Sequence, residues 1–249
     1  MKKIILLIFI LAVAALASVW YMHRLAAREA IQKQAVKAEV SILVREGLSV
    51  KEINAQLKKS GFLLDGSFLK KGKQHEGYLF PDTYRMYRDF TADDLIKKMR
   101  SNLDRKLTGD LREAIKDSGH TTGEIIIMAS ILEKEVRTEA DMKIVSGIFW
   151  DRLKINHALQ SDATLSYVLD SGKTAHSYEE TQIDSPYNTY KYPGLPPGPI
   201  SNPGLKAIRA AIYPTYTDYN YFLTRPDTGE TIFSKTLEEH NAAKAKYLK

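Results

Sequence analysis

The sequence of 249 residues contains no cysteine. The absence of thiols excludes a disulfide framework, a zinc–thiolate site, an iron–sulfur cluster and a cysteine nucleophile. Its six histidines show neither His-x-His nor His-x-x-x-His spacing, so we expect no metal site and no cofactor. The sequence also lacks a Gly-x-Ser-x-Gly elbow and a phosphate-binding loop, which leaves a serine hydrolase or a nucleotide-binding protein without a supporting motif.

Acidic residues are fewer than basic ones, 30 against 36, which gives a net charge of +6 at neutral pH. A basic protein suits an anionic polymer or surface, such as nucleic acid, a membrane or a cell wall, although the same balance also serves solubility. Lysine and arginine are spread along the chain, so charge alone does not choose among these partners. The hydrophobic share of 44% and the charged share of 27% are typical of a globular protein and exclude wholesale disorder.

One long apolar run, Ile4–Met22, follows two lysines at the N-terminus and is interrupted only by Ser18. Its length is close to the ~20 residues that a helix needs to cross a bilayer. A cleaved secretory signal is the alternative, because residues 15–17 have the small-x-small form of a cleavage site. The run continues past that site, so we expect a membrane anchor at residues 1–22 and a single-pass protein whose remaining chain is extracytoplasmic.

Residues 23–38 are rich in alanine, lysine, glutamate and glutamine and predict a helical stalk. Residues 39–75 predict a small subdomain with a strand over Ala38–Val44, a turn, and a helix that Ser49 caps and Gly61 ends. This strand–turn–helix piece is too small to fold as a domain by itself.

The remaining chain, residues 76–249, predicts a mainly helical domain with small antiparallel sheet elements, and the fold class is therefore α+β. Helices are expected from Thr91 to about Lys106, at Leu111–Ser118, after Thr121, at Asp141–Leu153 and at about Leu237–Leu248. A hairpin is expected from Tyr219–Leu223 and Thr231–Phe233. Residues 62–90 show few periodic signals, and the segment 184–204, dense in proline, glycine, tyrosine and asparagine, predicts a long shaped loop.

The helix after Thr121 is apolar almost all round and runs directly into Glu133 and Glu135. A buried carboxyl group has a raised pKa, which is what a general acid needs near neutral pH. Glu135 continues the apolar stripe formed by Ile125, Met128 and Leu132. Glu135 is therefore the better candidate for a raised pKa.

Glu133 lies one turn before Arg137, and such an i,i+4 pair favours an ionised carboxylate on a solvated face. The alternative for both acids is that they are solvated at the end of a helix. In that position the helix dipole would also raise their pKa.

Two later segments carry polar side chains suited to sugars. Gln160 and Asp162 are candidates for binding sugar hydroxyls, and Asp162 is also a candidate second catalytic carboxylate. The structural alternative is that Ser161 or Asp162 caps a helix that runs through Leu169. The loop 184–204 carries tyrosines and asparagines of the kind that stack on and hydrogen-bond to sugars, or it is an Ω-loop that covers the core.

Six blocks in a fixed order cover about residues 40–249: EGYLFPDTY (Glu76–Tyr84), MASILEKE (Met128–Glu135), LQSDAT (Leu159–Thr164), SPYNTY (Ser185–Tyr190), GLPPGPISNPG (Gly194–Gly204) and the terminal His240-Asn241. In these blocks the sequence resembles the MltG (YceG-like) endolytic murein transglycosylases. The resemblance implies cleavage of the β-1,4 bond between N-acetylmuramic acid and N-acetylglucosamine within nascent peptidoglycan strands. The product end is a 1,6-anhydro-N-acetylmuramic acid, formed without water.

The family's catalytic glutamate falls on Glu135, which the resemblance implies acts first as acid and then as base. The resemblance also implies one membrane span, peptidoglycan as substrate and cell-wall synthases as partners. Members usually carry a longer LysM-like region before the first block, so residues 39–75 are expected to be a reduced form of it. The candidates for binding glycan or stabilising the transition state are Glu76, Gln160, Asp162, Tyr187, Asn188, Tyr190 and Asn202.

Two alternatives remain open at this point. The first is a muramidase that uses water, with Asp162 as the partner of Glu135. The second is a non-enzymatic peptidoglycan-binding scaffold of the cell-wall synthesis machinery. Nucleic acid is not an expected partner, because export would separate the protein from it.

Overall fold

The computed structural model describes residues 15–29, 38–62, 64, 66–173 and 176–248. Contacts divide the chain into two units, Met1–Ile42 with Arg85–Thr91, and Leu43–Tyr84 with Ala92–Lys249. In the first unit, residues 15–29 are helical and exposed. Among the described residues, no helix combines the length and the apolar character needed to span a membrane. Most of the predicted anchor (residues 1–14) and of the predicted stalk (residues 30–37) lies outside the described residues.

Strands β1 (Glu39–Leu43) and β2 (Thr83–Tyr87) form a two-stranded sheet. The Arg88 N–H donates to the Ala38 carbonyl across one end of it, at 3.0 Å. The predicted strand at residues 38–44 is confirmed as β1, whereas β2 was not predicted.

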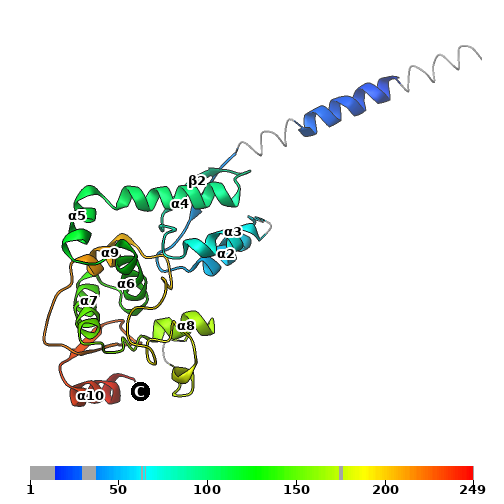
Figure 1. Ribbon diagram of the computed structural model, residues 1–249. Helices are drawn as coiled ribbons and strands as arrows, with labels where there is room; N and C mark the ends of the chain where they lie inside the picture. Colours follow the sequence, from blue (N-terminus) through cyan, green and yellow to red (C-terminus); the bar gives the residue numbers. More distant parts are fainter. Residues whose placement is uncertain (1–14, 30–37, 63, 65, 174–175, 249) are drawn as a thin grey trace, which may run out of the picture. The chain divides into compact units, whose positions relative to one another are not determined.

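The second unit is mainly helical (Figure 1). Its helices are α2 (Val50–Lys59), α3 (Ser67–Gly72), α4 (Ala92–Lys106), α5 (Gly109–Asp117), α6 (Thr122–Glu135), α7 (Glu139–Lys154), α8 (Asp162–Leu169), α9 (Leu205–Ile212) and α10 (Leu237–Tyr247), with 3₁₀ turns η1 (Lys73–His75) and η2 (Glu180–Gln182). Strands β3 (Tyr221–Thr224) and β4 (Thr231–Ser234) pair antiparallel, with Tyr221 opposite Ser234. The predicted α+β class is confirmed in this mixed, helix-rich arrangement.

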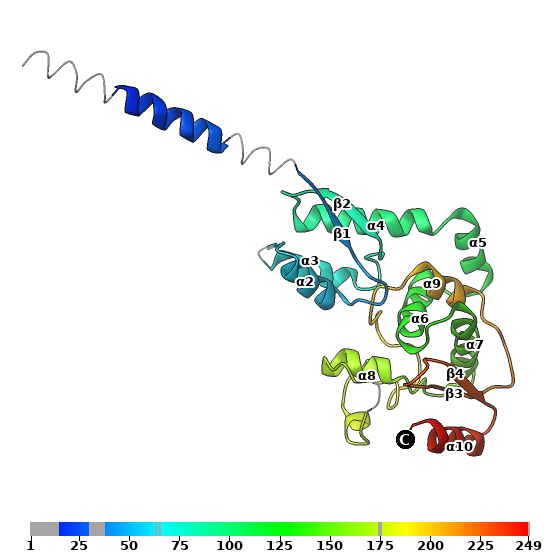
Figure 2. The ribbon, with the colours of Figure 1, turned by 180° about the vertical axis from the view of Figure 1, so that it is seen from behind.

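Local sequence fixes where the central helix α6 begins. The Thr121 hydroxyl accepts a hydrogen bond from the Glu124 N–H, and the Glu124 carboxylate accepts one from the Thr121 N–H. This capping box satisfies N–H groups that a helix start otherwise leaves without partners. The same device begins α2 at Ser49 and α10 at Thr236, and α10 packs beside the β3–β4 hairpin (Figure 2).

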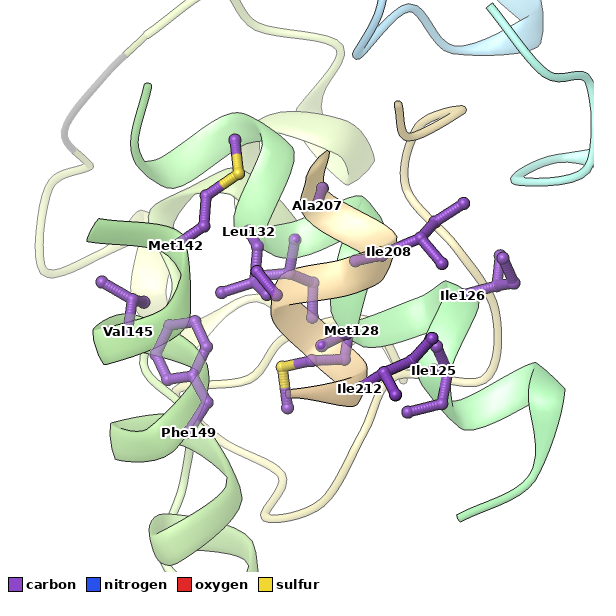
Figure 3. Close-up of a cluster of buried hydrophobic side chains, with 14 of the residues drawn as sticks. Ile125, Ile126, Met128, Leu132, Met142, Val145, Phe149, Ala207, Ile208 and Ile212 are labelled. Carbon is purple, nitrogen blue, oxygen red and sulfur yellow. The ribbon is translucent and has the colours of Figure 1, made fainter. Parts of the chain in front are cut away.

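The hydrophobic core forms where α9 packs against both α6 and α7 (Figure 3). Figure 3 shows side chains from all three helices meeting there, among them Ile208 of α9, Met128 of α6 and Phe149 of α7, each fully buried. The Trp150 Nε1–H of α7 also donates to the Ala211 carbonyl of α9, at 3.0 Å. Helix α9 was not predicted, although it is the element that joins the other two.

The predicted long loop before α9 is confirmed, because residues 184–204 contain only turns and irregular backbone. Its last part is held to α6 by two buried serines. The Ser130 hydroxyl accepts from the Ile200 N–H at 3.1 Å, and the Ser201 hydroxyl donates to the Ser130 carbonyl at 3.0 Å. These bonds fix the loop onto the helix that carries Glu133 and Glu135.

Candidate active site

Glu135 is the last residue of α6. The helix ends there because Val136 takes an extended conformation (φ −141°, ψ 159°). The Ser161 hydroxyl donates a hydrogen bond to Glu135 Oε1, and the nearby Ala163 N–H favours the charged form of the same carboxyl group and so lowers its pKa. Ser161 and Ala163 flank the first residue of α8, so the Glu135 carboxyl group lies at the N-terminus of that helix.

Burial is the dominant influence on this group and raises the pKa of Glu135 to about 7. The residue keeps partial solvent contact, whereas its carboxyl group is largely desolvated. The hydrogen bond from Ser161 opposes the rise, because it stabilises the charged form, and the negative charge of Asp162 adds to the rise. Glu135 therefore exchanges its proton near neutral pH, which confirms the predicted raised pKa.

Ser161 occupies the N-cap position of α8, but its side chain makes no capping hydrogen bond. An N-cap hydroxyl normally accepts from the helix backbone two or three residues on. Here the hydroxyl donates to Glu135 instead. The predicted helix through Leu169 is confirmed, and the side chain of its N-cap residue, Ser161, binds Glu135 rather than the helix backbone.

Asp162 and Tyr190 complete the polar surroundings of Glu135. The Tyr190 hydroxyl donates to Asp162 Oδ1 at 2.9 Å. Burial and the Asp162 charge raise the pKa of Tyr190, which therefore remains a hydrogen-bond donor. This pair brings the loop 184–204 and the start of α8 to the same place as the acid.

Arg152 of α7 was not predicted as a site residue. Its guanidinium group donates to the Leu159 carbonyl and, at 2.8 Å, to the Asn220 carbonyl. Desolvation lowers the pKa of Arg152, and the positive charge in turn lowers the pKa of Glu135. Nothing in the sequence pattern singles out this arginine, because its role depends on two carbonyls that are distant in sequence from each other.

The interpretation of Glu133 as a solvated acid paired with Arg137 is wrong. Helix α6 stops at Glu135, so Arg137 lies outside the helix and the i,i+4 spacing has no structural meaning. Glu133 Oε2 instead accepts a hydrogen bond from the Gly204 N–H at 2.9 Å. Burial raises the pKa of Glu133, as does the nearby charge of Glu46.

Glu76 lies in a second group of polar residues. Its carboxyl group accepts from the Val50 N–H at 3.0 Å and from Asn202 Nδ2 at 3.0 Å. Burial raises the pKa of Glu76 to about 7, and the Glu52 charge contributes to the rise. Burial and, after it, the negative charge of Glu76 raise the pKa of Tyr167 of α8.

The two candidate asparagines are fully buried. Asn202 Nδ2 also donates to the Leu48 carbonyl at 2.9 Å, and its Oδ1 accepts from the Leu79 N–H at 2.8 Å. Asn188 Nδ2 donates to the carbonyls of Thr181 (2.9 Å) and Ile183 (2.8 Å). Both amides therefore brace loops from within, which agrees with the Ω-loop alternative for this segment.

Gln160 and Tyr187 lie closer to solvent. Gln160 is exposed and has a positive φ of 54°, and its N–H donates to the Thr189 carbonyl at 2.9 Å. Tyr187 is half-buried, and its ring packs against that of Tyr167 with centroids 5.2 Å apart. Within the described residues, no group of three or more histidine, aspartate or glutamate side chains is placed to hold a metal ion.

Comparison with known proteins shows the family of this chain. The sequence profile of the YceG-like family matches residues 20–246. The chain belongs to the YceG-like family. A putative yceG-like protein from Listeria monocytogenes, known from its crystal structure, has a similar fold, with a TM-score of 0.72 and 33% sequence identity. The match covers 82% of this chain and 75% of the Listeria chain.

Two relatives of this chain carry the name endolytic murein transglycosylase. The protein from Bacillus subtilis is 41% identical over 174 residues, which are 70% of this chain and 48% of the relative. The protein from Streptococcus pneumoniae D39 is 34% identical over 180 residues, 70% of this chain and 32% of the relative. The chain therefore matches about half of the Bacillus protein and about a third of the Streptococcus protein.

Proposed function

We propose that this chain is an endolytic murein transglycosylase that cleaves glycan strands of peptidoglycan. The names of the relatives support the activity. One structural observation carries the proposal: Glu135 is a desolvated carboxyl group whose pKa burial raises to about 7, and the Ser161 hydroxyl binds it at the start of α8. Such a group is able to give up a proton and take one back at neutral pH.

The reaction needs one acid that later serves as a base. Glu135 gives its proton to the glycosidic oxygen while the bond between that oxygen and C1 of the muramyl sugar breaks. The C6 hydroxyl oxygen of the same sugar then forms a bond to C1, and its proton passes to the Glu135 carboxylate. The acid is restored, a 1,6-anhydro end is formed, and no water is consumed.

The other residues near Glu135 have supporting roles in this proposal. Asp162 supplies a negative charge near the reacting centre, where an oxocarbenium-like transition state carries positive charge, and Tyr190 holds it in place. Exposed Gln160 and half-buried Tyr187 are proposed to contact the glycan directly. Asn188 and Asn202, whose amides are bound by the protein, support the loops that present these groups.

The finer organisation of the chain is part of the proposal. Residues 1–22 form the membrane anchor, 23–38 a stalk, 39–75 a reduced LysM-like subdomain and 76–249 the catalytic domain. The apolar run at residues 4–22 supports the anchor. The catalytic domain then acts outside the cytoplasm, next to membrane-bound cell-wall synthases.

The decisive test is a digest of peptidoglycan with the full chain in detergent, analysed by mass spectrometry. Internal 1,6-anhydro ends that disappear with Glu135→Gln are the expected result. Full activity in a folded Glu135→Gln variant would refute the assignment of the acid. The matched control is Glu133→Gln, which changes a neighbouring buried acid bound to the Gly204 N–H rather than to α8.

The position of Asp162 supports one alternative, a water-using muramidase. In that case the products carry hydrated reducing ends, which are heavier by one water, and Asp162→Asn abolishes them. Binding to peptidoglycan without any product would instead indicate the scaffold alternative.

A further inference from the structure

Two buried threonines bind the backbone of Ser161, the residue whose hydroxyl donates to Glu135. The Ser161 N–H donates to Thr189 Oγ1 at 3.1 Å, and the Thr164 hydroxyl donates to the Ser161 carbonyl at 2.8 Å. The two threonine hydroxyls lie 2.9 Å apart. All three residues are at most 2% exposed, so these polar groups depend on one another for hydrogen bonds.

The direction of each hydrogen bond follows from the protons available. A hydroxyl group has one proton, and that of Thr164 goes to the Ser161 carbonyl, which can only accept. The proton between the two threonines therefore comes from Thr189. The bonds close a cycle from the Ser161 N–H through Thr189 and Thr164 back to the Ser161 carbonyl, which we call the threonine ring.

Thr189 is also fixed by bonds outside the threonine ring. Its carbonyl accepts from the Gln160 N–H at 2.9 Å, so Thr189 binds two successive N–H groups immediately before α8. The neighbouring Asn188 is fully buried, and its amide binds two backbone carbonyls of the preceding segment. The loop 184–204 thus presents Thr189 to the start of α8 in a defined position.

The threonine ring uses both backbone polar groups of Ser161 and leaves its hydroxyl for Glu135. We propose that Thr164 and Thr189 are positioning residues, which hold the Ser161 backbone so that its hydroxyl stays on the Glu135 carboxyl group. The threonine hydroxyls are used within the ring, so they act on the acid through Ser161. The kinetic consequence of this inference rests on the proposed function, whereas the positioning itself does not.

The test replaces each threonine by valine, which keeps the branched shape and removes the hydroxyl. Thr189→Val leaves the Ser161 N–H without its acceptor, and Thr164→Val takes the hydroxyl donor from the Ser161 carbonyl. Thr189→Ser and Thr164→Ser keep a hydroxyl and serve as rescue variants. The matched control is Thr181→Val, which removes a hydroxyl that donates to the Tyr178 carbonyl, outside the threonine ring.

The first measurement is an NMR titration of ¹³C-labelled glutamate carboxyl groups in the full chain in detergent, which needs no substrate. The Glu135 signal is assigned as the one that Glu135→Gln lacks. When the Ser161 hydroxyl is no longer held, the Glu135 carboxylate loses a stabilising donor, and its acidity falls by roughly tenfold in both valine variants. The serine variants and Thr181→Val are expected to titrate like the wild-type chain.

A double variant shows whether the threonines act through the Ser161 hydroxyl. In Ser161→Ala that hydroxyl is already absent, so adding Thr189→Val leaves the Glu135 titration where Ser161→Ala alone puts it. A displaced charge near the acid would instead move the titration in both backgrounds. The other charged or titratable groups that face Glu135, which every variant retains, are Asp162, Arg152 and Tyr190.

The second measurement is the pH profile of kcat/KM for release of anhydro ends. In both valine variants the high-pH limb moves to higher pH and kcat falls by about 10- to 100-fold, because the proton donor is less well oriented. KM changes little, since both threonines are buried, and the serine variants restore most of the lost kcat.

Three results would overturn the positioning role. They are an unchanged Glu135 titration in valine variants that fold by near-UV circular dichroism, a serine variant as impaired as its valine counterpart, and an equal further shift when Thr189→Val is added to Ser161→Ala. Absence of anhydro ends from the wild-type chain refutes the proposed function, while the titration still decides the positioning role.

Discussion

Replacing Ser161 by alanine tests the site at its most informative bond. The Ser161 hydroxyl donates to Glu135 Oε1 and makes no capping bond to α8. Ser161→Ala therefore leaves the backbone of the helix start as it is and removes one donor from the acid. The residue is 2% exposed, so water does not easily replace the lost hydroxyl.

A hydrogen bond to a charged group contributes about 1.5–3 kcal/mol. The Ser161 bond acts mainly on the carboxylate form of Glu135, so its loss weakens the acid by roughly tenfold or more. The pKa of Glu135, already raised to about 7, rises further. The protonated form of Glu135, which begins the proposed reaction, then persists to higher pH.

The assay is the rate of anhydro-end formation measured across pH. The high-pH limb of kcat/KM is expected to move upward, and kcat at the optimum is expected to fall, because a weaker and less well oriented acid transfers its proton more slowly. Ser161→Thr, which keeps a hydroxyl, serves as the control. A limb that stays in place in Ser161→Ala would show that this hydroxyl does not act on the proposed catalytic acid, Glu135.

Three further predictions follow from the same structure. Asp162→Asn removes a negative charge that raises the pKa of Glu135, so the high-pH limb moves to lower pH, opposite to Ser161→Ala, and an upward shift would contradict this. Glu135→Gln is expected to raise thermal stability at pH 8. The pKa of Glu135 in the folded protein, about 7, exceeds its ordinary value of 4.5, so the wild-type protein loses stability, by a few kcal/mol at most, as the pH rises between these values. A neutral glutamine at this position does not titrate and avoids that loss. Calorimetry should show the difference vanish below about pH 4. Gly77→Ala is expected to lower the stability against urea more than Gly61→Ala does. Both glycines have a positive φ (82° and 80°), but only at Gly77 would the added Cβ overlap with Pro199 and Ile126. Equal urea midpoints for the two variants would refute this steric overlap.

The sequence predicted the elements whose signals are local. The capping box of Thr121 and Glu124 locates the start of α6, and Ser49 locates the start of α2. The hairpin was predicted from its turn residues, and its strands begin and end within about two residues of the expected positions. The capping boxes depend on hydrogen bonds between residues three apart, and the hairpin depends on the residues of its own short turn, so the sequence alone shows these signals.

Helix α9 shows why other elements escaped prediction. It has only eight residues, and it follows a long irregular loop without a side-chain cap at Gly204. An isolated helix of this length is marginal in water, so its stability comes from packing between α6 and α7. An apolar spacing at Leu205, Ile208 and Ile212 was the available signal, but its meaning depends on the two helices that receive it.

The choice between Glu133 and Glu135 shows how far spacing can locate an active site. The stripe argument placed Glu135 beside the buried residues of α6, and the structure gives it a desolvated carboxyl group. The argument against Glu133 failed, because it assumed that the helix continues to Arg137. Burial alone does not separate the two acids, since both have a raised pKa.

What separates the two acids is the partner that each one binds. Glu133 accepts from the Gly204 N–H, which begins a helix of the core, whereas Glu135 accepts from Ser161 at the start of α8, next to Asp162 and exposed Gln160. The second arrangement places a carboxyl group whose pKa is raised to about 7 beside an exposed polar side chain, Gln160. The catalytic candidate is therefore defined by tertiary contacts made 26 residues away, and no pattern within α6 contains that information.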